Sequence, residues 1–358
     1  MNNKRAMIAM SGGVDSSVAA YLMKMSGYDC IGATMKLFSN ENVGVSREKS
    51  CCSLEDVEDA RSVAYKMHMP YYVFNFSDTF NQEVIERFVC AYEHGITPNP
   101  CIDCNRYLKF NKFFMRAKEL GYDYIVTGHY ARIKYNEQSK RYELKKAFDK
   151  NKDQSYVLYT MTQEQLAHTQ FPLGDMSKGE VRAIAEKNGF INAKKHDSQD
   201  ICFVQDGNYV QFIEKYRKKR YESGAFVDAD GNYLGEHKGI ICYTIGQRKG
   251  LGVSFGEPKY VADINAEKNE VVLTGREGLY SRIVLADNIN LISVEKISEP
   301  MVVTAKVRYS QHEQKAVVKQ INNDIIEIEF EEPQRAVTKG QAVVLYDKDT
   351  VVGGGTII

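Results

Sequence analysis

Residues 10–17, with the sequence MSGGVDSS, have the types and order needed to hold a phosphate group. They follow a short apolar run at residues 5–10, typical of a buried strand, and precede apolar positions at helical spacing that end at Gly27. Gly12 and Gly13 can adopt positive φ and let the backbone approach an anion closely. The free N–H groups of the first helical turn, the serine hydroxyls and the helix dipole would then stabilise the negative charge.

Two better-known phosphate motifs do not fit this octet. No lysine follows the glycines as a Walker A loop requires, and the G-x-G-x-x-G pattern of dinucleotide-binding folds does not match either. The octet instead resembles the PP-loop of ATP pyrophosphatases, enzymes that cleave ATP between the α and β phosphates and adenylate a substrate. An ordinary glycine turn before a helix is the alternative. Asp15 could position Mg²⁺ or groups on the adenine side, or could simply cap the helix.

A second chemically useful group is a pair of thiols, Cys101 and Cys104, in a proline-bounded loop before a helix. A thiolate near a helix N-terminus has a lowered pKa and acts as a nucleophile or a metal ligand. Cys202, flanked by polar residues, is a third thiol outside the apolar patterns. No second C-x-x-C or nearby histidine pair in the sequence completes a zinc site, so a functional set and unrelated thiols both stay open. Of the other cysteines, Cys30, Cys90 and Cys242 lie on apolar patterns that predict core packing, and Cys51 and Cys52 end an irregular polar stretch.

Strands and helices must place these groups together, and their order predicts an α/β fold with a doubly wound parallel sheet. After the first strand, apolar runs at residues 30–37, 71–76 and 124–127 alternate with helical patterns. Ligands of such sheets bind beyond the carboxyl ends of the strands. The loops after the first, second and fourth strands all belong to that edge, which is therefore the predicted site.

The rest of the chain predicts two smaller, mainly β units. Residues 131–146 are typical of a hairpin insertion, and helical stretches then continue to Gly189. A glycine-rich region at residues 224–256 predicts a small, mostly β domain, and later alternating segments predict a C-terminal antiparallel β-barrel. We therefore expect a PP-loop ATP-binding catalytic domain at residues 1–206, a small central domain at 207–278 and the barrel at 279–358.

The composition is that of an ordinary globular protein, with 43% hydrophobic and 26% charged residues in a chain of 358. The formal net charge is zero, so a nucleic acid would have to be met by a local basic face. No apolar run approaches the length of a membrane span, and no signal-peptide pattern precedes the octet. Eight cysteines in such a chain indicate a reducing, cytoplasmic location without membrane association.

Further motifs follow the octet in a fixed order: TPNPxxxCN, TGHY, NKDQSY, DSxxICF and TIGQRKGLG. Together they resemble the tRNA-specific 2-thiouridylases, the MnmA family, over essentially the whole chain. The resemblance implies an ATP-dependent sulfurtransferase that thiolates C2 of the wobble uridine (U34) of tRNA. Family enzymes adenylate the C2 oxygen, release pyrophosphate and install sulfur received as a persulfide. Adenylation suits this chemistry because a uridine carbonyl is a poor electrophile until its oxygen becomes a good leaving group.

The resemblance also implies a role for individual residues. Cys202 would carry the persulfide and Cys104 would be the partner nucleophile, and the two would join as a disulfide during turnover. ATP, with Mg²⁺, would be held by Ala9, Met10, Ser11, Gly12, Gly13, Val14, Asp15, Ser16, Met35 and Gly128. The target base would meet Asn99, Pro100 and Cys101, with further tRNA contacts from Lys152, Asp153, Gln154, Arg308 and Tyr309. The implied partners are tRNA and a sulfur-donor protein, such as a cysteine desulfurase or a sulfur-relay carrier.

The side chains of two segments are suited to contact RNA, independently of the family resemblance. Arg308 and Tyr309, in a predicted strand, offer a charge and an aromatic ring suited to a flipped-out base, with a barrel-surface pair as the alternative. Residues 247–250, QRKG, form a basic loop that could touch RNA phosphates or could be a solvated turn.

One position departs from the family pattern. Many members have aspartate three residues before the nucleophilic cysteine, where this chain has Cys101. An acid–base role for that aspartate therefore does not carry over. The change creates a set of three thiols, Cys101, Cys104 and Cys202, as in related PP-loop enzymes that bind a [4Fe–4S] cluster, so cluster-dependent thiolation is an alternative mechanism.

Two other readings compete with thiolation. Another PP-loop adenylating synthetase would usually need ammonia from a glutaminase domain, which the sequence does not contain, and its cysteine pair would be idle. A nucleotide sensor without chemistry would not need both Cys104 and Cys202. The sequence leaves open which tRNAs are modified, which protein delivers sulfur, the oligomeric state and the order of residues 38–52.

Overall fold

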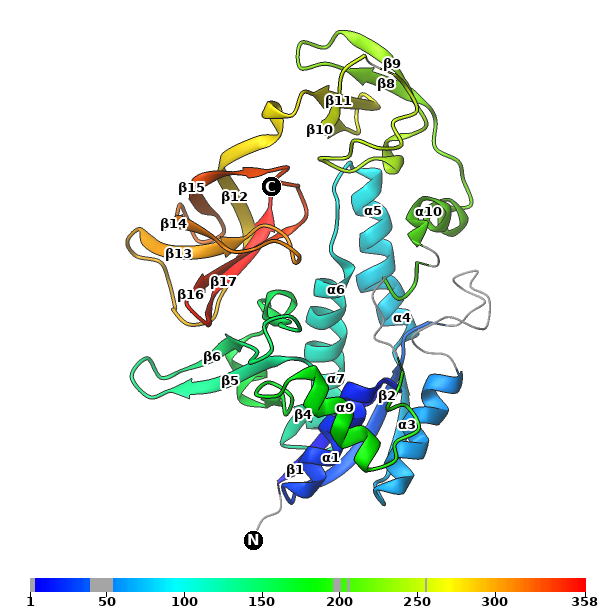
Figure 1. Cartoon of the computed structure of the whole chain (residues 1–358), viewed down its shortest axis with the longest axis vertical. Helices are drawn as coiled ribbons and strands as arrows, with labels where there is room; N and C mark the ends of the chain where they lie inside the picture. The colour runs from blue at the N-terminus through cyan, green and yellow to red at the C-terminus, as the bar shows by residue number, and fades with distance from the viewer. Residues whose placement is uncertain (1–3, 39–53, 196–200, 205–206, 255) are drawn as a thin grey trace.

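The computed structural model describes residues 4–38, 54–195, 201–204, 207–254 and 256–358. The predicted irregular stretch that contains Cys51 and Cys52 lies almost wholly outside these residues. The described chain has a parallel sheet at one end, a small β domain at the other and a β-barrel beside the long helices that join them (Figure 1). This arrangement confirms the predicted fold class.

The parallel sheet has the strand order β3-β2-β1-β4-β7, with every pair parallel. The chain moves outward from β1 through β2 to β3 and then returns to the other side of β1 for β4. The order therefore reverses between β1 and β4, and a ligand crevice is expected outside their carboxyl ends. The two-residue strand β7 is an addition that the sequence pattern does not predict. The strands are β1 (Arg5–Ala9), β2 (Asp29–Lys36), β3 (Tyr71–Asn75), β4 (Tyr124–Val126) and β7 (Thr169–Gln170).

Helices cover both faces of this sheet, because alternate side chains of β1 enter two different cores. Ala6 and Ile8 pack in one cluster with Val18, while Met7 and Ala9 pack in the other with Phe88. The first face is covered by α1 (Val14–Met25), α3 (Leu54–Lys66) and α9 (Lys178–Lys187). The elements on the second side are α4 (Ser77–Phe80), η1 (Asn81–Glu86), α6 (Pro100–Asp103), η2 (Cys104–Lys112) and α7 (Phe113–Glu119). The helix α5 (Arg87–Glu93) continues from η1 away from the sheet, toward the central domain (Figure 1).

The predicted hairpin insertion is confirmed, and it joins the sheet of the C-terminal barrel. Its strands pair with each other and extend the sheet of the C-terminal barrel, where Lys145 lies opposite Thr350. A sequence segment of the first domain is thus built into the last one. The elements here are β5 (Ala131–Asn136), β6 (Arg141–Lys146), η3 (Ser155–Leu158) and α8 (Gln163–Ala167).

The barrel is a closed antiparallel sheet of six strands in the order β12-β15-β14-β13-β16-β17, closed by pairing of β12 with β17. Its interior is filled by aliphatic residues and Phe330. Arg308 and Tyr309 lie in the turn after β13, so their predicted position within a strand is wrong. The elements are η6 (Glu277–Leu279), β12 (Tyr280–Leu291), β13 (Met301–Lys306), β14 (Gln314–Gln320), β15 (Ile326–Arg335), β16 (Ala342–Asp347) and β17 (Thr350–Ile357).

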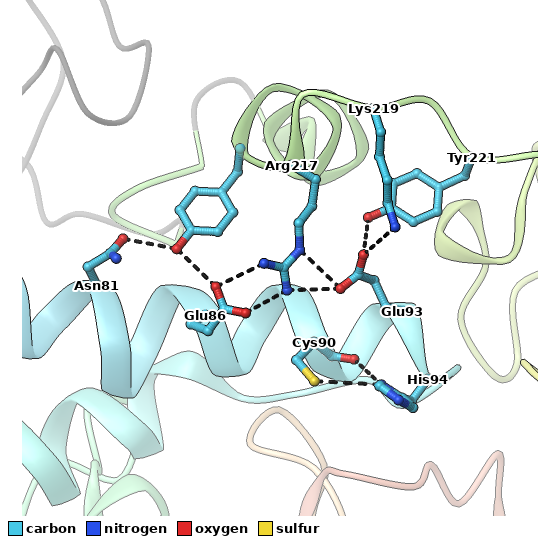
Figure 2. Close-up of polar contacts among 9 residues, drawn as sticks. Asn81, Glu86, Cys90, Glu93, His94, Arg217, Lys219 and Tyr221 are labelled. Carbon is cyan, nitrogen blue, oxygen red and sulfur yellow. Dashed lines mark hydrogen bonds and ion pairs between the residues drawn. The ribbon is translucent and has the colours of Figure 1, made fainter.

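The central domain is a four-stranded sheet of order β10-β11-β8-β9, preceded by a helix that ties it to α5. Figure 2 shows that Arg217 at the end of this helix bonds both Glu86 and Glu93, while Lys219 and Tyr221 bond Glu93 from the next segment. The network fixes the small domain on the helices of the catalytic domain. The elements are α10 (Tyr209–Arg217), β8 (Gly224–Val227), β9 (Tyr233–His237), η5 (Ile240–Cys242), β10 (Tyr260–Asn265) and β11 (Glu270–Thr274).

This network makes a pH-dependent contribution to stability through Glu93. Burial alone would raise the pKa of Glu93, but bonds from Tyr221, Lys219 and Arg217 lower it to about 2. Because the folded pKa is below the ordinary value of 4.5, the stabilisation is present above pH 4.5 and is lost as the pH falls toward 2. We expect Glu93→Gln to lower stability by roughly 1–3 kcal/mol at pH 7 and by progressively less below pH 4.5.

Urea unfolding at pH 7, 5 and 3.5 measures the difference, with Glu164→Gln as the control. Glu164 also pairs with a lysine, Lys118, but on the exposed surface, so its substitution is expected to leave the unfolding midpoint unchanged. An equal effect of Glu93→Gln at pH 7 and pH 3.5 would show that the carboxylate charge contributes nothing.

Candidate active site

The loop between β1 and α1 has the shape expected of an anion-binding turn, and its first glycine is required. Gly12 has φ +76°, and a Cβ there would lie 2.4 Å from the carbonyl oxygen of Asp56 on α3. Gly13 does not adopt the positive φ considered for it in the sequence analysis. It is the N-cap of α1 and has an extended φ of −88°. The turn thus depends on one left-handed glycine, and the N–H groups of the first turn of α1 face the crevice edge.

The serine hydroxyls of the octet shape the loop. Ser16 Oγ donates to the Gly13 carbonyl at 3.0 Å and accepts from Ser11 N at 3.2 Å. Ser17 Oγ donates to the same carbonyl at 3.1 Å, and the Ser17 side chain is fully buried. The predicted use of the Ser17 hydroxyl to hold a ligand's negative charge is therefore wrong, because this group is enclosed and already bonded.

Asn192 holds the loop from behind, and no motif in the sequence marks it. Its Nδ2 donates to the Gly12 carbonyl and to Ser17 Oγ, each at 2.9 Å. The residue is 2% exposed, and its Oδ1 has no hydrogen-bond partner among the residues that the structure describes. The conformation of the loop is thus fixed by a side chain 175 positions away from Ser17.

Asp15 does not cap α1, since no side chain among the described residues caps this helix. Its carboxylate instead accepts two bonds from Lys178 Nζ, at 2.7 and 2.8 Å, and one from the Tyr130 hydroxyl at 2.8 Å. Gly128, after β4, approaches the same turn so closely that a Cβ would lie 2.8 Å from Ser16 N. The loops after β1 and β4 therefore meet at the switch point, as the topology predicts.

The imidazole of the TGHY motif is buried and neutral. Burial lowers the pKa of His129 well below its ordinary value, and the neighbouring Lys109 lowers it further. Thr127 Oγ1 lies 2.7 Å from Nδ1 and Lys109 Nζ lies 3.3 Å from Nε2. Since an ammonium can only donate, Nε2 accepts and Nδ1 carries the proton. The motif thereby links the end of β4 to η2, which begins at Cys104.

A second anchor joins this region to the segment before Cys202. Lys195 Nζ bonds the carboxylates of Asp56 and Asp59 on α3, each at 2.7 Å. Burial opposes the charge on Lys195, but the two carboxylates raise its pKa overall. Since the backbone of Asp56 also lies against Gly12, Lys195 is tied through α3 to the phosphate loop.

The cysteines predicted to act are accessible and border one hydrophobic cluster. Cys101 is exposed in α6, and Cys104 is partly buried at the start of η2. Cys202 is also partly buried, and the ring of Phe203 beside it packs against Phe80 and Phe88. Cys104 and Cys202 pack against the same core, formed in part by these rings. No disulfide is seen among the described residues.

Three other cysteines, all predicted to pack in the core, differ in how deeply they are buried. Cys30 is buried as predicted, and burial raises the pKa of its thiol to about 11. Cys242 is half-buried, and burial raises its pKa as well. The prediction for Cys90 is wrong, because its thiol is exposed on α5, 3.6 Å from His94 Nδ1 (Figure 2). Its apolar neighbours pack inward while it points outward.

The residues expected to contact tRNA partly converge. The Tyr309 hydroxyl donates to the Asp153 carbonyl at 3.1 Å, and Lys306 Nζ lies 5.7 Å from the centre of the Tyr309 ring. Burial raises the pKa of Tyr309, and the charges of Asp153 and Cys101 raise it further. The barrel turn and the segment at 152–154 therefore form one surface.

Two of the predicted tRNA residues are used inside the protein. Arg308 donates to the Ala336 carbonyl and to Thr338 Oγ1 of the barrel. Gln154 exchanges bonds with the backbone of Tyr130, each at 2.9 Å. Their side chains support the fold at this surface, and Tyr309 is the more exposed member of its pair, at 44%.

The structure contains no evident metal cluster among its described residues: no three histidine, cysteine, aspartate or glutamate side chains are grouped closely enough to hold an ion. Within the same residues, no helix is both long and apolar enough to cross a membrane. Cys101, Cys104 and Cys202 are all described residues, and they do not form such a group.

Three family descriptions match consecutive parts of the chain. A tRNA methyl transferase HUP domain matches residues 4–206, a PRC-barrel domain of the same name matches 210–274, and an aminomethyltransferase β-barrel domain matches 281–357. Among solved structures, a 4-thiouridine synthetase bound to RNA and ATP is 17% identical, with a TM-score of 0.35 over 60% of this chain and 50% of that one. A likeness this distant carries no argument about function.

The curated relatives are far more similar. The tRNA-specific 2-thiouridylase MnmA of Clostridioides difficile is 53% identical over 99% of this chain and 98% of its own length. That of Acetivibrio thermocellus is 51% identical over the full length of both chains. The predicted resemblance is confirmed by these matches, and the chain belongs to the MnmA family of tRNA-specific 2-thiouridylases.

Proposed function

We propose that this chain carries out the reaction of its family, the ATP-dependent thiolation of C2 of the wobble uridine in tRNA, with Cys104 and Cys202 transferring the sulfur. The observation that best supports this is the presence, in one domain, of a PP-loop at the β1/β4 switch point and of two partly buried thiols, Cys104 and Cys202, that border the same hydrophobic cluster. An ATP-dependent enzyme needs the first and a sulfurtransferase needs the second. We also propose a cytoplasmic location and a persulfide donor protein.

In the first half-reaction the PP-loop would hold the phosphates of ATP. The uridine O2 attacks the α-phosphorus, the bond from that phosphorus to the bridging oxygen breaks, and pyrophosphate leaves with the electron pair. The backbone N–H groups at the start of α1 are placed to stabilise the charge that develops on the phosphates. The bonds from Lys178 and Tyr130 to Asp15 keep that turn in place during the reaction.

In the second half-reaction the terminal sulfur of a persulfide on Cys202 attacks C2, and AMP leaves with the former O2. The Cys104 thiolate then attacks Sγ of Cys202, so that the sulfur–sulfur bond breaks and the outer sulfur stays on the base as a thiocarbonyl. The two cysteines are left as a disulfide, which an external dithiol must reduce before the next turnover.

This scheme includes no binding site formed by protein side chains for Mg²⁺ or for a [4Fe–4S] cluster. The described residues offer no group of three metal ligands, and the Asp15 carboxylate is already bonded to an ammonium and a phenol. We therefore assign no step to a metal held by the protein. A magnesium ion carried in by ATP would neutralise its phosphates.

The proposed function is tested by reconstitution with an unmodified tRNA transcript, ATP, cysteine and a cysteine desulfurase. We expect pyrophosphate and AMP to form only when the tRNA is present, and nucleoside mass spectrometry to detect 2-thiouridine at the wobble position. Pyrophosphate release without a thiolated base would leave only an adenylating activity, and no RNA-dependent release would overturn the proposal.

The third thiol gives a prediction that separates the two sulfur mechanisms. Cys101→Ser is expected to keep wild-type thiolation, because the persulfide route uses only Cys104 and Cys202 and because Cys101 is exposed in α6. Anaerobic purification followed by absorbance spectroscopy and the thiolation assay makes the comparison. An iron–sulfur chromophore that disappears in Cys101→Ser together with thiolation would replace the persulfide route with cluster chemistry.

Tyr309 gives a prediction about tRNA recognition. We expect Tyr309→Ala to weaken tRNA binding by about 5- to 100-fold, because stacking of a base on an aromatic ring contributes roughly 1–3 kcal/mol. ATP affinity should not change, since the ring lies beside Asp153 at the barrel turn. Tyr309→Phe is the matched control that keeps the ring. Equal tRNA affinity of the alanine and wild-type proteins at one fixed salt concentration would exclude the contact.

A further inference from the structure

A cavity of about 290 Å³ lies between the catalytic domain and the barrel, apart from the phosphate loop. The helices α5, α6 and η2 form one wall, and strands β12, β16 and β17 form the other, which Figure 1 shows facing each other across the middle of the molecule. Its polar lining includes Arg87, Asn99, Asp103, Arg106, Asn288 and Thr356. None of these side chains except Asn99 has a role in the proposed reaction.

The charge of the cavity is positive. Two arginines line it against one carboxylate, in a chain whose overall net charge is zero. The guanidinium carbons of Arg87 and Arg106 lie 5.0 and 5.4 Å from the centre of the Tyr107 ring, so both cations are held beside the same aromatic side chain. Arg87 Nε lies 3.7 Å from Asp103 Oδ2, a long contact that leaves the other guanidinium nitrogens available for a ligand.

The cavity is also accessible and continuous with the proposed tRNA surface. The Arg87 side chain is 50% exposed. Asn99 and Tyr159 both line the cavity, and the ring of Tyr156, in η3 just before Tyr159, lies 5.8 Å from the Tyr309 ring. The backbone just before Asn99 is fastened to the barrel by Gln341, whose Nε2 donates to the carbonyls of Thr97 at 2.9 Å and Pro98 at 3.1 Å. A strand of RNA that crosses Tyr309 therefore passes the mouth of the cavity.

We propose that this cavity binds a backbone phosphate of the tRNA strand next to the target uridine, held by Arg87 and Arg106. The inference rests on the proposed function and adds a recognition site to it. A planar guanidinium matches the geometry of a phosphate, and a polar lining with two cations suits an anion better than a base. The phosphates of ATP already have their site at the PP-loop, so RNA is the source of phosphate that this position favours.

The test compares Arg87→Gln and Arg106→Gln with the wild-type protein in filter-binding titrations of tRNA over a series of KCl concentrations. Each variant is expected to bind tRNA about 5- to 30-fold more weakly at low salt. The magnitude of the slope of log K against log[salt] should fall by about 0.9. Arg116→Gln is the matched control, because Arg116 pairs with Glu119 on the exposed surface of α7 and does not line the cavity. It should bind as the wild type does.

A further variant leaves both arginines in place. Asn288 is exposed on the barrel wall of the cavity with φ +45°, a conformation that aspartate also tolerates. Its Nδ2 donates to Asp287 Oδ1 at 2.9 Å, so Asn288→Asp adds a negative charge and loses this one exposed bond. It should also weaken tRNA binding. Unchanged affinity and salt slope in all three folded variants overturn the inference, and loss of ATP affinity in the arginine variants would assign the cavity to the nucleotide instead.

These outcomes are distinct from failure of the proposed function. If the wild-type protein thiolates tRNA and the arginine variants keep its salt slope, only the phosphate site is wrong. If the wild-type protein binds tRNA with the predicted dependence on Arg87 and Arg106 but forms no 2-thiouridine, the phosphate site stands and the assigned chemistry fails.

Discussion

Cys202→Ser is expected to abolish thiolation of tRNA, by at least about a thousandfold, while pyrophosphate release during adenylation continues near the wild-type rate. A serine hydroxyl cannot carry a persulfide, but adenylation uses only the PP-loop and the uridine oxygen. The local structure should survive, because Cys202 is only partly buried and its neighbour Phe203 supplies the packing against Phe80 and Phe88. The adenylated tRNA should therefore accumulate or hydrolyse, and radiolabel from [α-³²P]ATP should appear on the RNA.

Cys104→Ser separates the roles of the two thiols. We expect it to stop turnover as well, but after the persulfide has attacked C2, so that the tRNA stays joined to Cys202 through the sulfur–sulfur bond. Before tRNA is added, mass spectrometry of the protein should detect the persulfide on Cys202 as an added sulfur atom. Cys242→Ser is the matched control, since its thiol is half-buried and outside the proposed site. Full thiolation by either active-site variant would contradict the two-cysteine mechanism.

The second large effect is expected at Asp15. Asp15→Ala should reduce RNA-dependent pyrophosphate release by about a hundredfold or more, because the N-terminal turn of α1 loses the bonds that fix it to α9 and to the loop after β4. The same change removes the ion pair between Asp15 and the Lys178 ammonium, which is 12% exposed. We therefore also expect a loss of stability of roughly 1–3 kcal/mol.

A double variant distinguishes the two consequences. Asp15→Ala combined with Lys178→Met removes the buried charge and should recover stability without recovering pyrophosphate release. Asp175→Asn is the control, because Asp175 pairs with Arg132 at an exposed position. A folded Asp15→Ala protein that releases pyrophosphate at the normal rate would show that the ion pair has no part in positioning the loop.

The parallel sheet could be predicted because its central strands are continuous apolar runs that have helices on both faces. The β1 segment, with four of its five residues buried, is the clearest case. Strand β7, by contrast, consists of only two residues and has no periodicity to detect. The pairing of β6 with β17 is equally invisible, because it joins segments about two hundred residues apart and depends on how the barrel docks.

The site could be predicted as a set of motifs but not as a set of contacts. The octet marks the phosphate loop, yet Asn192, Lys178 and Lys195, which fasten it, belong to no pattern. Cys90 shows the opposite error, since apolar neighbours on a helix do not reveal which way a single side chain points. Arg308 is an intermediate case, in which the motif position is informative but the guanidinium is used by the barrel.

The β5–β6 hairpin determines how separable the parts of this enzyme are. It lies before residue 150 in the chain yet forms part of the barrel sheet, and ion pairs of Arg132 and Lys145 with Asp349 and of Lys146 with Glu313 reinforce the junction. If the chain were divided between the central domain and the barrel, the edge of β17 that pairs with β6 would be exposed, and these ion pairs would be broken. The barrel is consequently not a module that can be exchanged by itself between related enzymes, and any recombination that preserves its docking must carry the hairpin with it.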